Sequence, residues 1–255
     1  MLQEKFLKEW RDNMTAEDID YEDLKKRGFL RQKQEGFFLF RTRMSSGIYR
    51  REQLDKVSQL AQEFGRGFVH LTVRQGIEIP FIKFQDISEV ELLIKSVGVN
   101  NGASGARLRA TTVCPGNNWC RQGLINTFAF SDRIENELGL KCGLDLPHKF
   151  KINISGCPNT CTRAQQSEIG LHGALDLSSK DKRIGYVIYL GGCGGKTPHT
   201  GFKLDKVFSE DVVLLIIKKV VNFFKVNAKP KQRLAVFIEE IGKEKFLKEV
   251  GAENP

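Results

Sequence analysis

The amino-acid sequence predicts an α+β protein built in two consecutive parts. Residues 36–98 show strand and helix patterns in the order β-α-β-β-α, and a stretch rich in Gly and Asn follows at 99–106. Beyond it, strand and helix patterns alternate around two pairs of cysteines. A chain of 255 residues with 40% hydrophobic residues can fill two small cores. We therefore expect one part over 1–104 and a second over 105–255.

Hydrophobic periodicity predicts the first elements. Residues 1–35 are charged and weakly periodic, which indicates a helix and a connecting segment. Aromatic and apolar residues over 36–44 predict a strand. Arg41 and Arg43 share one face of this strand, because side chains alternate along it. Apolar residues at helical spacing predict a helix over 50–65.

Two more strands and a second helix complete the first part. The apolar stretches 67–73 and 76–82 predict strands. Residues 86–98 predict a helix, which a capping box between Asp86 and Glu89 would open. The resulting β-α-β-β-α order is most of a ferredoxin-like α+β sandwich.

The second part begins with a helix expected over about 119–138 and a strand expected over 149–155. Another strand pattern spans 183–192. Residues 209–226 predict a largely buried helix, and 232–249 predict one or two more. Strands mixed with helices in this way are typical of an α/β domain.

Charge and the N-terminal residues narrow the class of protein. No apolar run reaches the roughly 18 residues of a membrane-spanning helix, and residues 1–14 lack the pattern of a secretory signal. We therefore expect a cytoplasmic protein without a membrane partner. A net charge of +9 fits nucleic acid, an acidic protein, an anionic membrane or a small anion. Because the basic residues are spread rather than gathered with aromatic ones, we expect no nucleic-acid binding.

Four cysteines form two closely spaced pairs in loops rich in Pro, Gly and Asn. Cys114 and Cys120 are spaced C-x5-C, and Cys157 and Cys161 are spaced C-x3-C. Structural disulfides are uncommon in the cytoplasm, and neither spacing is a usual zinc knuckle. Four thiolates converging from loops suit an iron–sulfur cluster. The spacing therefore favours a cluster and leaves a zinc site and unligated thiols open.

The segments VCPGNNWCRQGLINT (113–127) and SGCPNTCTRAQQSEIGLHG (155–173) resemble the siroheme-dependent sulfite and nitrite reductases. The signature of that family is C-x5-C followed by C-x3-C, and the likeness runs from about residue 28 to about residue 200. The resemblance implies that a siroheme- and 4Fe–4S-binding α/β domain follows the ferredoxin-like half-domain. It also implies that the four cysteines hold a 4Fe–4S cluster, with Cys161 bridging to the siroheme iron.

The resemblance assigns the binding of the oxyanion to four basic residues. They match Arg41, Arg109, Lys149 and Lys151 by position. An oxyanion that takes up electrons and loses oxygen needs fixed positive charge and proton donors, which Arg forks and Lys ammonium groups supply. Lys149 and Lys151 lie two apart on the expected strand and would share one face of it.

Siroheme carries many carboxylates, which require cations and amide donors. The segment HLTVRQG (70–76) resembles the part of the family that grips these carboxylates. We expect His70 itself to be a satisfied core or edge-strand residue. Two asparagines, Asn117 and Asn159, are also candidates, and turn formation is the alternative to cofactor binding for both. The expected cofactor-binding residues are Arg43, Thr72, Arg74, Gln75, Asn117, Asn159 and Cys161.

Two cysteines lie outside the paired motif. Cys142 is expected to be a thiol without a cofactor role. Cys193 lies in the glycine-rich segment LGGCGGKTPHTG, which looks like a phosphate-binding loop. A P-loop has four residues between its first Gly and its Gly-Lys-Thr, whereas Gly191 and Gly195 are separated by three. We therefore expect a loop whose glycines allow close backbone approach to the cofactors, as in the family.

The predicted function is the six-electron reduction of sulfite to sulfide. Reduction of nitrite to ammonia is the alternative on the same scaffold. A non-catalytic electron-transfer subunit and a zinc-bound nucleic-acid protein are the competing classes.

Better-known family members carry two copies of the two-part unit, whereas this chain resembles the compact members that carry one. We expect a homodimer or a subunit of a larger complex, with a ferredoxin-like protein as electron donor.

Overall fold

The computed structural model describes residues 19–177 and 182–253. The chain divides into two compact units. The first holds the residues up to Met44 together with Tyr49–Gly102, and the second holds Ser45–Ile48 and the residues from Ala103 onward. Within the described residues, we find no helix with the length and apolarity that a membrane crossing requires.

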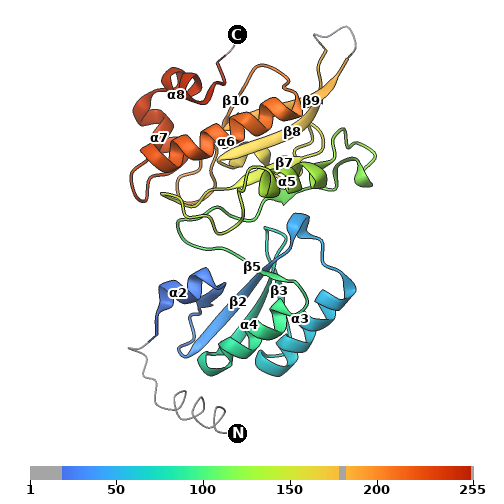
Figure 1. The fold of residues 1–255 in the computed structure, drawn as a ribbon, viewed down its shortest axis with the longest axis vertical. Helices are drawn as coiled ribbons and strands as arrows, with labels where there is room; N and C mark the ends of the chain where they lie inside the picture. Colours follow the sequence, from blue (N-terminus) through green and yellow to red (C-terminus); the bar gives the residue numbers. More distant parts are fainter. Residues whose placement is uncertain (1–18, 178–181, 254–255) are drawn as a thin grey trace. The chain divides into compact units, whose positions relative to one another are not determined.

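The first unit is an antiparallel sheet covered by helices (Figure 1). Its strand order is β1-β2-β4-β3, and β5 pairs with β2. Helices α3 and α4 lie side by side. The strands are β1 (Phe29–Arg31), β2 (Phe37–Arg43), β3 (His70–Leu71), β4 (Ile77–Lys83) and β5 (Asn100–Asn101). The helices are α2 (Tyr21–Lys26), α3 (Arg51–Phe64), the 3-10 turn η3 (Phe84–Asp86) and α4 (Ile87–Lys95).

Strand β2 shows why this sheet has one buried face. Phe38, Phe40 and Thr42 are buried, whereas the residues between them are partly exposed. Arg41 and Arg43 therefore share the other face of the strand, as its alternation predicted. Helices α3 and α4 add apolar side chains to the same core, among them Val57, Leu60, Ala61, Ile87, Val90 and Ile94.

The β-α-β-β-α order is confirmed, but two details of the first unit differ from expectation. The strand expected over 67–73 is only His70–Leu71 long, because the chain turns at Thr72, whose hydroxyl accepts the Gly76 N–H at 3.1 Å. The capping box at Asp86 is wrong. Asp86 already has helical angles (φ −92°, ψ −8°) and makes no side-chain cap bond, since η3 runs directly into α4.

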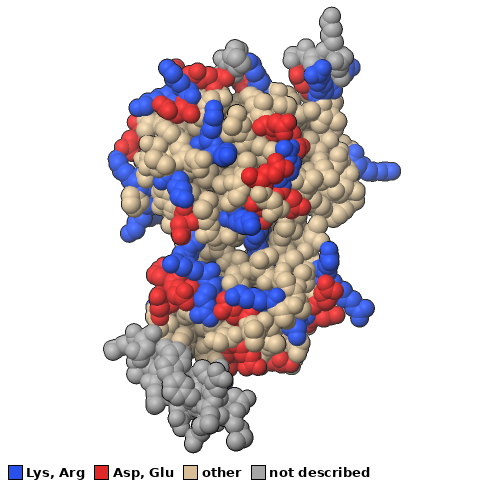
Figure 2. All heavy atoms as spheres, in the orientation of Figure 1, with Lys and Arg blue, Asp and Glu red and all other residues tan. Residues whose placement is uncertain are grey.

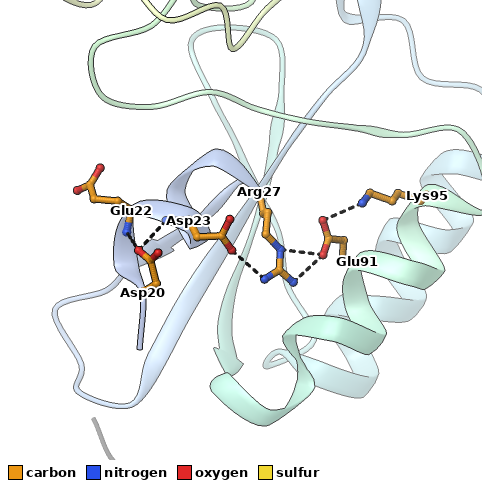
Figure 3. A network of polar contacts seen from close by, with 6 residues as sticks. All are labelled: Asp20, Glu22, Asp23, Arg27, Glu91 and Lys95. Carbon is orange, nitrogen blue, oxygen red and sulfur yellow. Dashed lines mark hydrogen bonds and ion pairs between the residues drawn. The ribbon is translucent and has the colours of Figure 1, made fainter. Parts of the chain in front are cut away.

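An ion-pair network joins α2 to α4 within the first unit (Figure 3). The Arg27 Nε and Nη2 atoms donate to Glu91 Oε2 at 2.9 and 2.7 Å. Lys95 Nζ donates to the other oxygen of Glu91 at 2.9 Å, and Asp23 accepts from Arg27 Nη1 at 3.2 Å. Burial alone would raise the pKa of the Glu91 carboxyl, but the hydrogen bonds from Arg27 and Lys95 outweigh it and lower that pKa.

We expect Glu91→Gln to lower the free energy of unfolding of the first unit by about 1–3 kcal/mol at pH 7. Glu91 is 13% exposed, and the variant would leave the Arg27 Nε and Nη2 atoms without their anionic acceptor, so that only Asp23 still pairs with Arg27. Since the pKa of Glu91 is lowered by folding, its contribution is present above the unfolded-state pKa of about 4.3 and is lost as the pH falls. Urea unfolding at pH 7 and pH 3.5 measures both effects. Glu22→Gln, at an exposed pair with Lys25, is the control. Equal unfolding midpoints for Glu91→Gln and Glu22→Gln would contradict this prediction.

The second unit contains a mixed sheet in the order β10-β9-β8-β7-β6. Strands β6, β7 and β8 are parallel, and β8, β9 and β10 are antiparallel. The strands are β6 (Thr112–Val113), β7 (Ile152–Ser155), β8 (Ile169–Leu175), β9 (Ile184–Leu190) and β10 (Phe202–Lys203). The helices are α5 (Thr127–Asn136), α6 (Glu210–Asn227), α7 (Leu234–Ile241) and α8 (Lys243–Val250), with 3-10 turns η2 (Ser45–Gly47), η4 (Gly116–Asn118) and η5 (Ala164–Gln166).

Helix α6 lies against the sheet of this unit (Figure 1). One apolar face of the helix contributes to the core. Val213, Ile217, Val220 and Phe224 are fully buried at helical spacing. Leu215 is 51% exposed, so the expectation of a largely buried helix holds for one face only.

Five other elements of the second unit differ from expectation. The helix expected over 119–138 begins at Thr127, because the Asn126 side chain caps it by accepting the Ala129 N–H at 3.0 Å. The strand expected over 149–155 begins only at Ile152. Strands β6, β8 and β10 were not predicted.

Charged side chains of both signs are interspersed on the face drawn in Figure 2. The net charge of +9 is therefore not gathered into one basic patch on that face. This distribution agrees with the expectation drawn from the sequence that the basic residues are spread.

Candidate functional site

Two adjacent parallel strands place the two cysteine loops side by side. Thr112 pairs with Asn153, and Val113 pairs with Ile154. Because β6 and β7 run in the same direction, the loops that follow them leave the same edge of the sheet. The Cys114 N–H extends this pairing by donating to the Ile154 carbonyl at 3.2 Å.

Hydrogen bonds join the two loops beyond the strand ends. The Gly156 N–H donates to Cys114 Sγ at 3.0 Å. The Leu124 N–H donates to the Gly156 carbonyl at 2.8 Å, and within the first loop the Gly123 N–H donates to the Cys120 carbonyl at 3.0 Å. The first loop is thus bonded to the second on both sides of Cys120.

Three glycines allow the backbones of these loops to touch. A Cβ atom on Gly123 would lie 2.2 Å from the carbonyl carbon of Gly116, and one on Gly156 would lie 2.6 Å from the Gly116 Cα. Gly116 itself has a φ of +57°, in the left-handed region that favours glycine. No larger residue fits at these crossings without moving a backbone.

The four paired cysteines differ in exposure and form no disulfide. Cys120 and Cys161 are exposed, and Cys114 and Cys157 are half-buried. In the described part of the chain, no three His, Cys, Asp or Glu side chains lie close enough to hold a single metal ion. Soft thiolates on adjacent loops, with an N–H directed at one sulfur, fit the ligand chemistry of an iron–sulfur cluster.

Basic residues precede both strands, just as cysteines follow them. Leu108 and Phe150 form a parallel bridge, and the Arg109 N–H donates to the Phe150 carbonyl at 2.8 Å. Arg109 thus lies beside the segment that carries Lys149 and Lys151. Both lysines precede β7 rather than lying on it, because regular pairing starts at Ile152.

Lys151 is bonded through backbone and side chain to the segment after the second cysteine pair. Its N–H donates to Glu168 Oε2 at 2.9 Å, and its Nζ donates to the Gln166 carbonyl at 3.1 Å. Glu168 also accepts a hydrogen bond from Arg233, which begins α7. Burial raises the pKa of the Glu168 carboxyl, whereas the charges of Lys151 and Arg233 oppose that rise. Sequence reasoning missed this pair, although Glu168 lies inside the quoted cysteine segment.

His148 lies among the basic residues of the second unit. Burial lowers the pKa of the His148 imidazole. The charges of Arg233, Lys149 and Arg109 lower this pKa further, because another positive charge is disfavoured beside them. The Lys149 N–H donates to His148 Nδ1 at 2.7 Å, which requires an unprotonated nitrogen there.

We expect His148 to make the second unit sensitive to acid. Since folding lowers the pKa of His148, its contribution to stability is present above the unfolded-state pKa of about 6.5 and is lost as the pH falls below it. One such proton changes the free energy of unfolding by at most about 1.4 kcal/mol per pH unit. His148→Gln should therefore lose less stability than the parent between pH 7.5 and pH 5.5 in urea unfolding. Parallel curves for the two proteins would contradict this expectation.

The candidate residues of the first unit begin with Arg41, which is paired with an acid. Arg41 Nε and Nη2 lie 2.7 and 2.6 Å from Glu78 Oε1, and His70 Nδ1 lies 3.0 Å from Glu78 Oε2. His70 is thus a partnered histidine on the edge strand β3, as expected. Burial alone would raise the pKa of Glu78, but the hydrogen bonds from His70 and Arg41 outweigh it and lower that pKa.

The turn between β3 and β4 carries three further candidates of the first unit. The Thr72 hydroxyl accepts the N–H groups of Arg74 at 3.4 Å and Gly76 at 3.1 Å. Gln75 has a φ of +61°, and Val73 is 95% exposed. The Thr72 hydroxyl is therefore used within the turn itself. For Arg74 and Gln75, binding of the cofactor stays a prediction from the resemblance.

The candidate asparagines lie in the exposed cysteine loops. Asn117 and Asn159 are exposed, and the Asn117 N–H donates to the Ile125 carbonyl at 2.9 Å. The neighbouring Asn118 donates from Nδ2 to the Pro115 carbonyl at 2.8 Å, which is turn chemistry.

The glycine-rich loop after β9 closes on itself. Cys193 is buried and forms an antiparallel bridge with His199, in which both N–H···O distances are 2.9 Å. A Cβ atom on Gly192 would lie 2.2 Å from the Gln165 carbonyl oxygen, so this loop packs against η5 after Cys161. Cys142 is half-buried and in no disulfide.

The structure thus brings part of the predicted site together in one unit. The second unit holds the four cysteines, Arg109, Lys149, Lys151, Asn117 and Asn159. The first unit holds Arg41, Arg43, Thr72, Arg74 and Gln75.

Two family models match the chain. The nitrite and sulphite reductase 4Fe-4S domain matches residues 104–255, and the nitrite/sulfite reductase ferredoxin-like half domain matches residues 30–97. The 4Fe-4S domain therefore accounts for more than half of the chain.

Similar proteins carry related names. The chain is 27% identical to the coenzyme F420-dependent sulfite reductase of Methanocaldococcus jannaschii, over 88% of this chain and 44% of that protein. It is 32% identical to the ferredoxin–nitrite reductase of Synechococcus elongatus, over 81% of this chain and 41% of that protein. The chain thus spans less than half the length of these two relatives.

A solved structure, the NirA protein of Mycobacterium tuberculosis, has the same fold with a TM-score of 0.77. Its sequence is 20% identical, and the match covers 96% of this chain and 50% of that one. Siroheme and a 4Fe–4S cluster are the cofactors that the family matches imply for this chain. On the match of the 4Fe-4S domain to residues 104–255, this chain belongs to the nitrite and sulphite reductase family.

Proposed function

We propose that the chain reduces sulfite to sulfide, with Cys114, Cys120, Cys157 and Cys161 as the ligands of a 4Fe–4S cluster. The observation that carries the proposal is the pairing of the two cysteine loops at the carboxyl ends of β6 and β7. Cys161 would also bridge the cluster to siroheme. When bound, the coupled cofactors would pass electrons from the external donor to the substrate.

The basic residues would bind the anion and provide its protons. Arg109, Lys149 and Lys151 come from two adjacent segments of the second unit, and Arg41 comes from the first. Arg109 Nη2 donates to the Gly105 carbonyl at 2.8 Å, which limits its side-chain freedom. Guanidinium groups would orient the oxyanion, and the Lys ammonium groups would hold protons at Nζ for the leaving oxygens.

The carboxylates of siroheme would be held by cationic and polar side chains of the predicted set. Arg and amide side chains suit carboxylates because they present several donors. The residues in question are Arg43, Thr72, Arg74, Gln75, Asn117 and Asn159.

Sulfite is the proposed substrate, and nitrite is the alternative. The relative from Methanocaldococcus jannaschii that matches 88% of this chain is named a sulfite reductase, and the four-cation set is complete. The relatives named nitrite reductases, among them one of Haloferax mediterranei at 27% identity over 85% of this chain, support the alternative. A non-catalytic electron-transfer subunit would keep the cysteines without needing the cations.

The proposed electron donor is a separate ferredoxin-like protein in the cytoplasm. The net charge of +9 would steer an acidic donor toward the chain, which predicts docking that weakens with salt. We propose a homodimer or a subunit of a larger complex as the assembly. A strict monomer in light scattering at micromolar concentration would contradict the homodimer.

An anaerobic preparation tests the proposed function. Its visible spectrum, iron and acid-labile sulfide are measured first, and turnover of sulfite and nitrite with a reduced dye follows. Siroheme bands with faster sulfite turnover would support the proposal. Faster nitrite turnover would favour the alternative, and cofactors without turnover would indicate the electron-transfer subunit. A colourless zinc protein would overturn the assignment.

Arg109→Ala and Lys149→Ala are expected to keep the visible spectrum while reducing turnover by about a hundredfold, because each removes a fixed charge from the oxyanion. Lys248→Ala, at an exposed position of α8, is the control and should leave turnover unchanged. Normal turnover in the Arg109 and Lys149 variants would show that these residues lie outside the anion site.

A further inference from the structure

A buried carboxylate lies among the basic residues of the second unit. The Glu168 side chain is 1% exposed, and its two oxygens have different partners. Oε1 accepts from Arg233 Nη2, and Oε2 accepts the Lys151 N–H at 2.9 Å. A buried charge is tolerated only where it is paired and hydrogen-bonded, so these contacts are a condition for burying Glu168.

Glu168 ties together three segments that are distant in sequence. Arg233 lies 65 residues further along the chain and is 16% exposed where α7 begins. Just before it, the Lys231 N–H donates to the Pro147 carbonyl at 2.8 Å. The start of α7 therefore packs against the segment that leads to Lys151.

Lys151 is the residue on which these contacts converge. Its N–H is held by Glu168, its carbonyl accepts the Ile169 N–H at 3.1 Å, and its Nζ donates to Gln166 at 3.1 Å. A lysine side chain is flexible and presents an undirected point charge. Contacts at backbone and ammonium together give this lysine a defined place.

The charges around Glu168 explain why an acid is needed at this position. The pKa of His148 is lowered by the charges of Arg233, Lys149 and Arg109. The charges of Lys151 and Arg233 likewise favour the ionised form of Glu168. Like charges gathered this closely repel one another. A carboxylate buried between Lys151 and Arg233 offsets that repulsion.

We propose that Glu168, with Arg233 as its counter-ion, is a positioning residue for Lys151. This inference rests on the proposed function, in which Lys151 binds the oxyanion. Glu168 would act through Lys151 and would not touch the substrate.

Steady-state kinetics of Glu168→Gln with sulfite give the first test. The amide has the same size and keeps an oxygen for the Lys151 N–H, but it removes the negative charge. We expect kcat to fall about tenfold, because the Lys151 ammonium loses the attraction of the Glu168 charge and keeps only its bond to the Gln166 carbonyl. We expect KM to stay equal or fall, because the site becomes more positive by one charge. Glu240→Gln, at an exposed ion pair with Lys229, is the control and should leave both constants unchanged.

Hydrogen–deuterium exchange gives a readout that needs no turnover. Glu168→Ala removes the acceptor of the Lys151 N–H, so exchange of that amide should become about five- to tenfold faster than in Glu168→Gln. If Glu168→Ala does not fold, Arg233→Gln replaces it. That variant leaves Glu168 without its counter-ion and should speed exchange in the same segment.

The outcomes separate the two proposals. A lower kcat with an unchanged or lower KM, together with faster local exchange, supports the positioning role. Exchange of the Lys151 amide in Glu168→Ala (or in Arg233→Gln, if that replaces it) at the rate of the parent would overturn this role. Kinetic constants of Glu168→Gln equal to those of the parent would overturn it as well. If the parent reduces neither anion, the proposed function fails, and the exchange data still decide whether Glu168 holds Lys151.

Discussion

Cys114→Ala is expected to reduce the iron and acid-labile sulfide of the anaerobically purified protein at least about tenfold. A 4Fe–4S cluster held by four thiolates loses one of its anchors, and even the loss of an outer partner of a metal site costs roughly ten- to hundredfold in affinity. Cys114 also accepts the Gly156 N–H at 3.0 Å, so its sulfur contacts the backbone of the second cysteine loop.

Cys142→Ala is the matched control for this experiment. Both cysteines are half-buried and in no disulfide, but Cys142 lies outside the paired motif. Iron and sulfide are measured per chain, beside the visible spectrum and the far-ultraviolet circular dichroism. Full cluster content in Cys114→Ala would show that Cys114 does not ligate the cluster. An equal loss in Cys142→Ala would show that the loss is not specific to the paired cysteines.

Gly123→Ala is expected to destabilise the second unit by about 3 kcal/mol or more and to prevent cluster assembly. The added Cβ would lie 2.2 Å from the Gly116 carbonyl carbon and 2.4 Å from the Asn117 nitrogen. Both are backbone atoms, so no side-chain rotation relieves the clash. The two cysteine loops would have to separate, which would break the contact between Leu124 and Gly156.

Gly194→Ala is the control for the glycine prediction. No atom lies within 4 Å of a Cβ built on Gly194, so the change should stay within about 0.5 kcal/mol. Urea unfolding compares the free energies of unfolding of the two variants, and iron content is measured on the same samples. Equal stability for Gly123→Ala and Gly194→Ala would mean that the cysteine loops do not cross where the structure places them.

Some of the fold could be predicted because its signals are local. Alternation along β2 predicted that Arg41 and Arg43 share a face, and the burial of Phe38 and Phe40 confirms it. Apolar spacing likewise predicted α3, since a helix buries residues of its own neighbouring turns.

Strand β8 escaped prediction because its signal is not local. It reads IGLHGAL, and glycine disfavours strands. Its glycines are required by neighbours from elsewhere in the chain. A Cβ on Gly170 would lie 1.9 Å from the Ala164 carbonyl oxygen, and one on Gly173 would lie 2.6 Å from that of Gly156.

The start of β7 also could not be predicted from local periodicity. Alternation predicted a strand from Lys149, but pairing with β8 starts only at Ile152. Before that point, the Lys151 N–H bonds to a side chain, Glu168, rather than to a strand. A side chain that takes the place of a strand partner leaves no trace in the periodicity of the segment it holds.

The sequence by itself determined the family and the spacing of the paired cysteines, because residue type and short spacing are properties of the chain alone. Only the tertiary structure decided that the two cysteine loops meet through Gly156 and Cys114, and that Arg233 and Glu168 share a buried ion pair. These contacts join residues far apart in the chain. Their formation depends on how parallel strands and α7 pack, and that packing is the sum of many weak interactions that no single segment encodes.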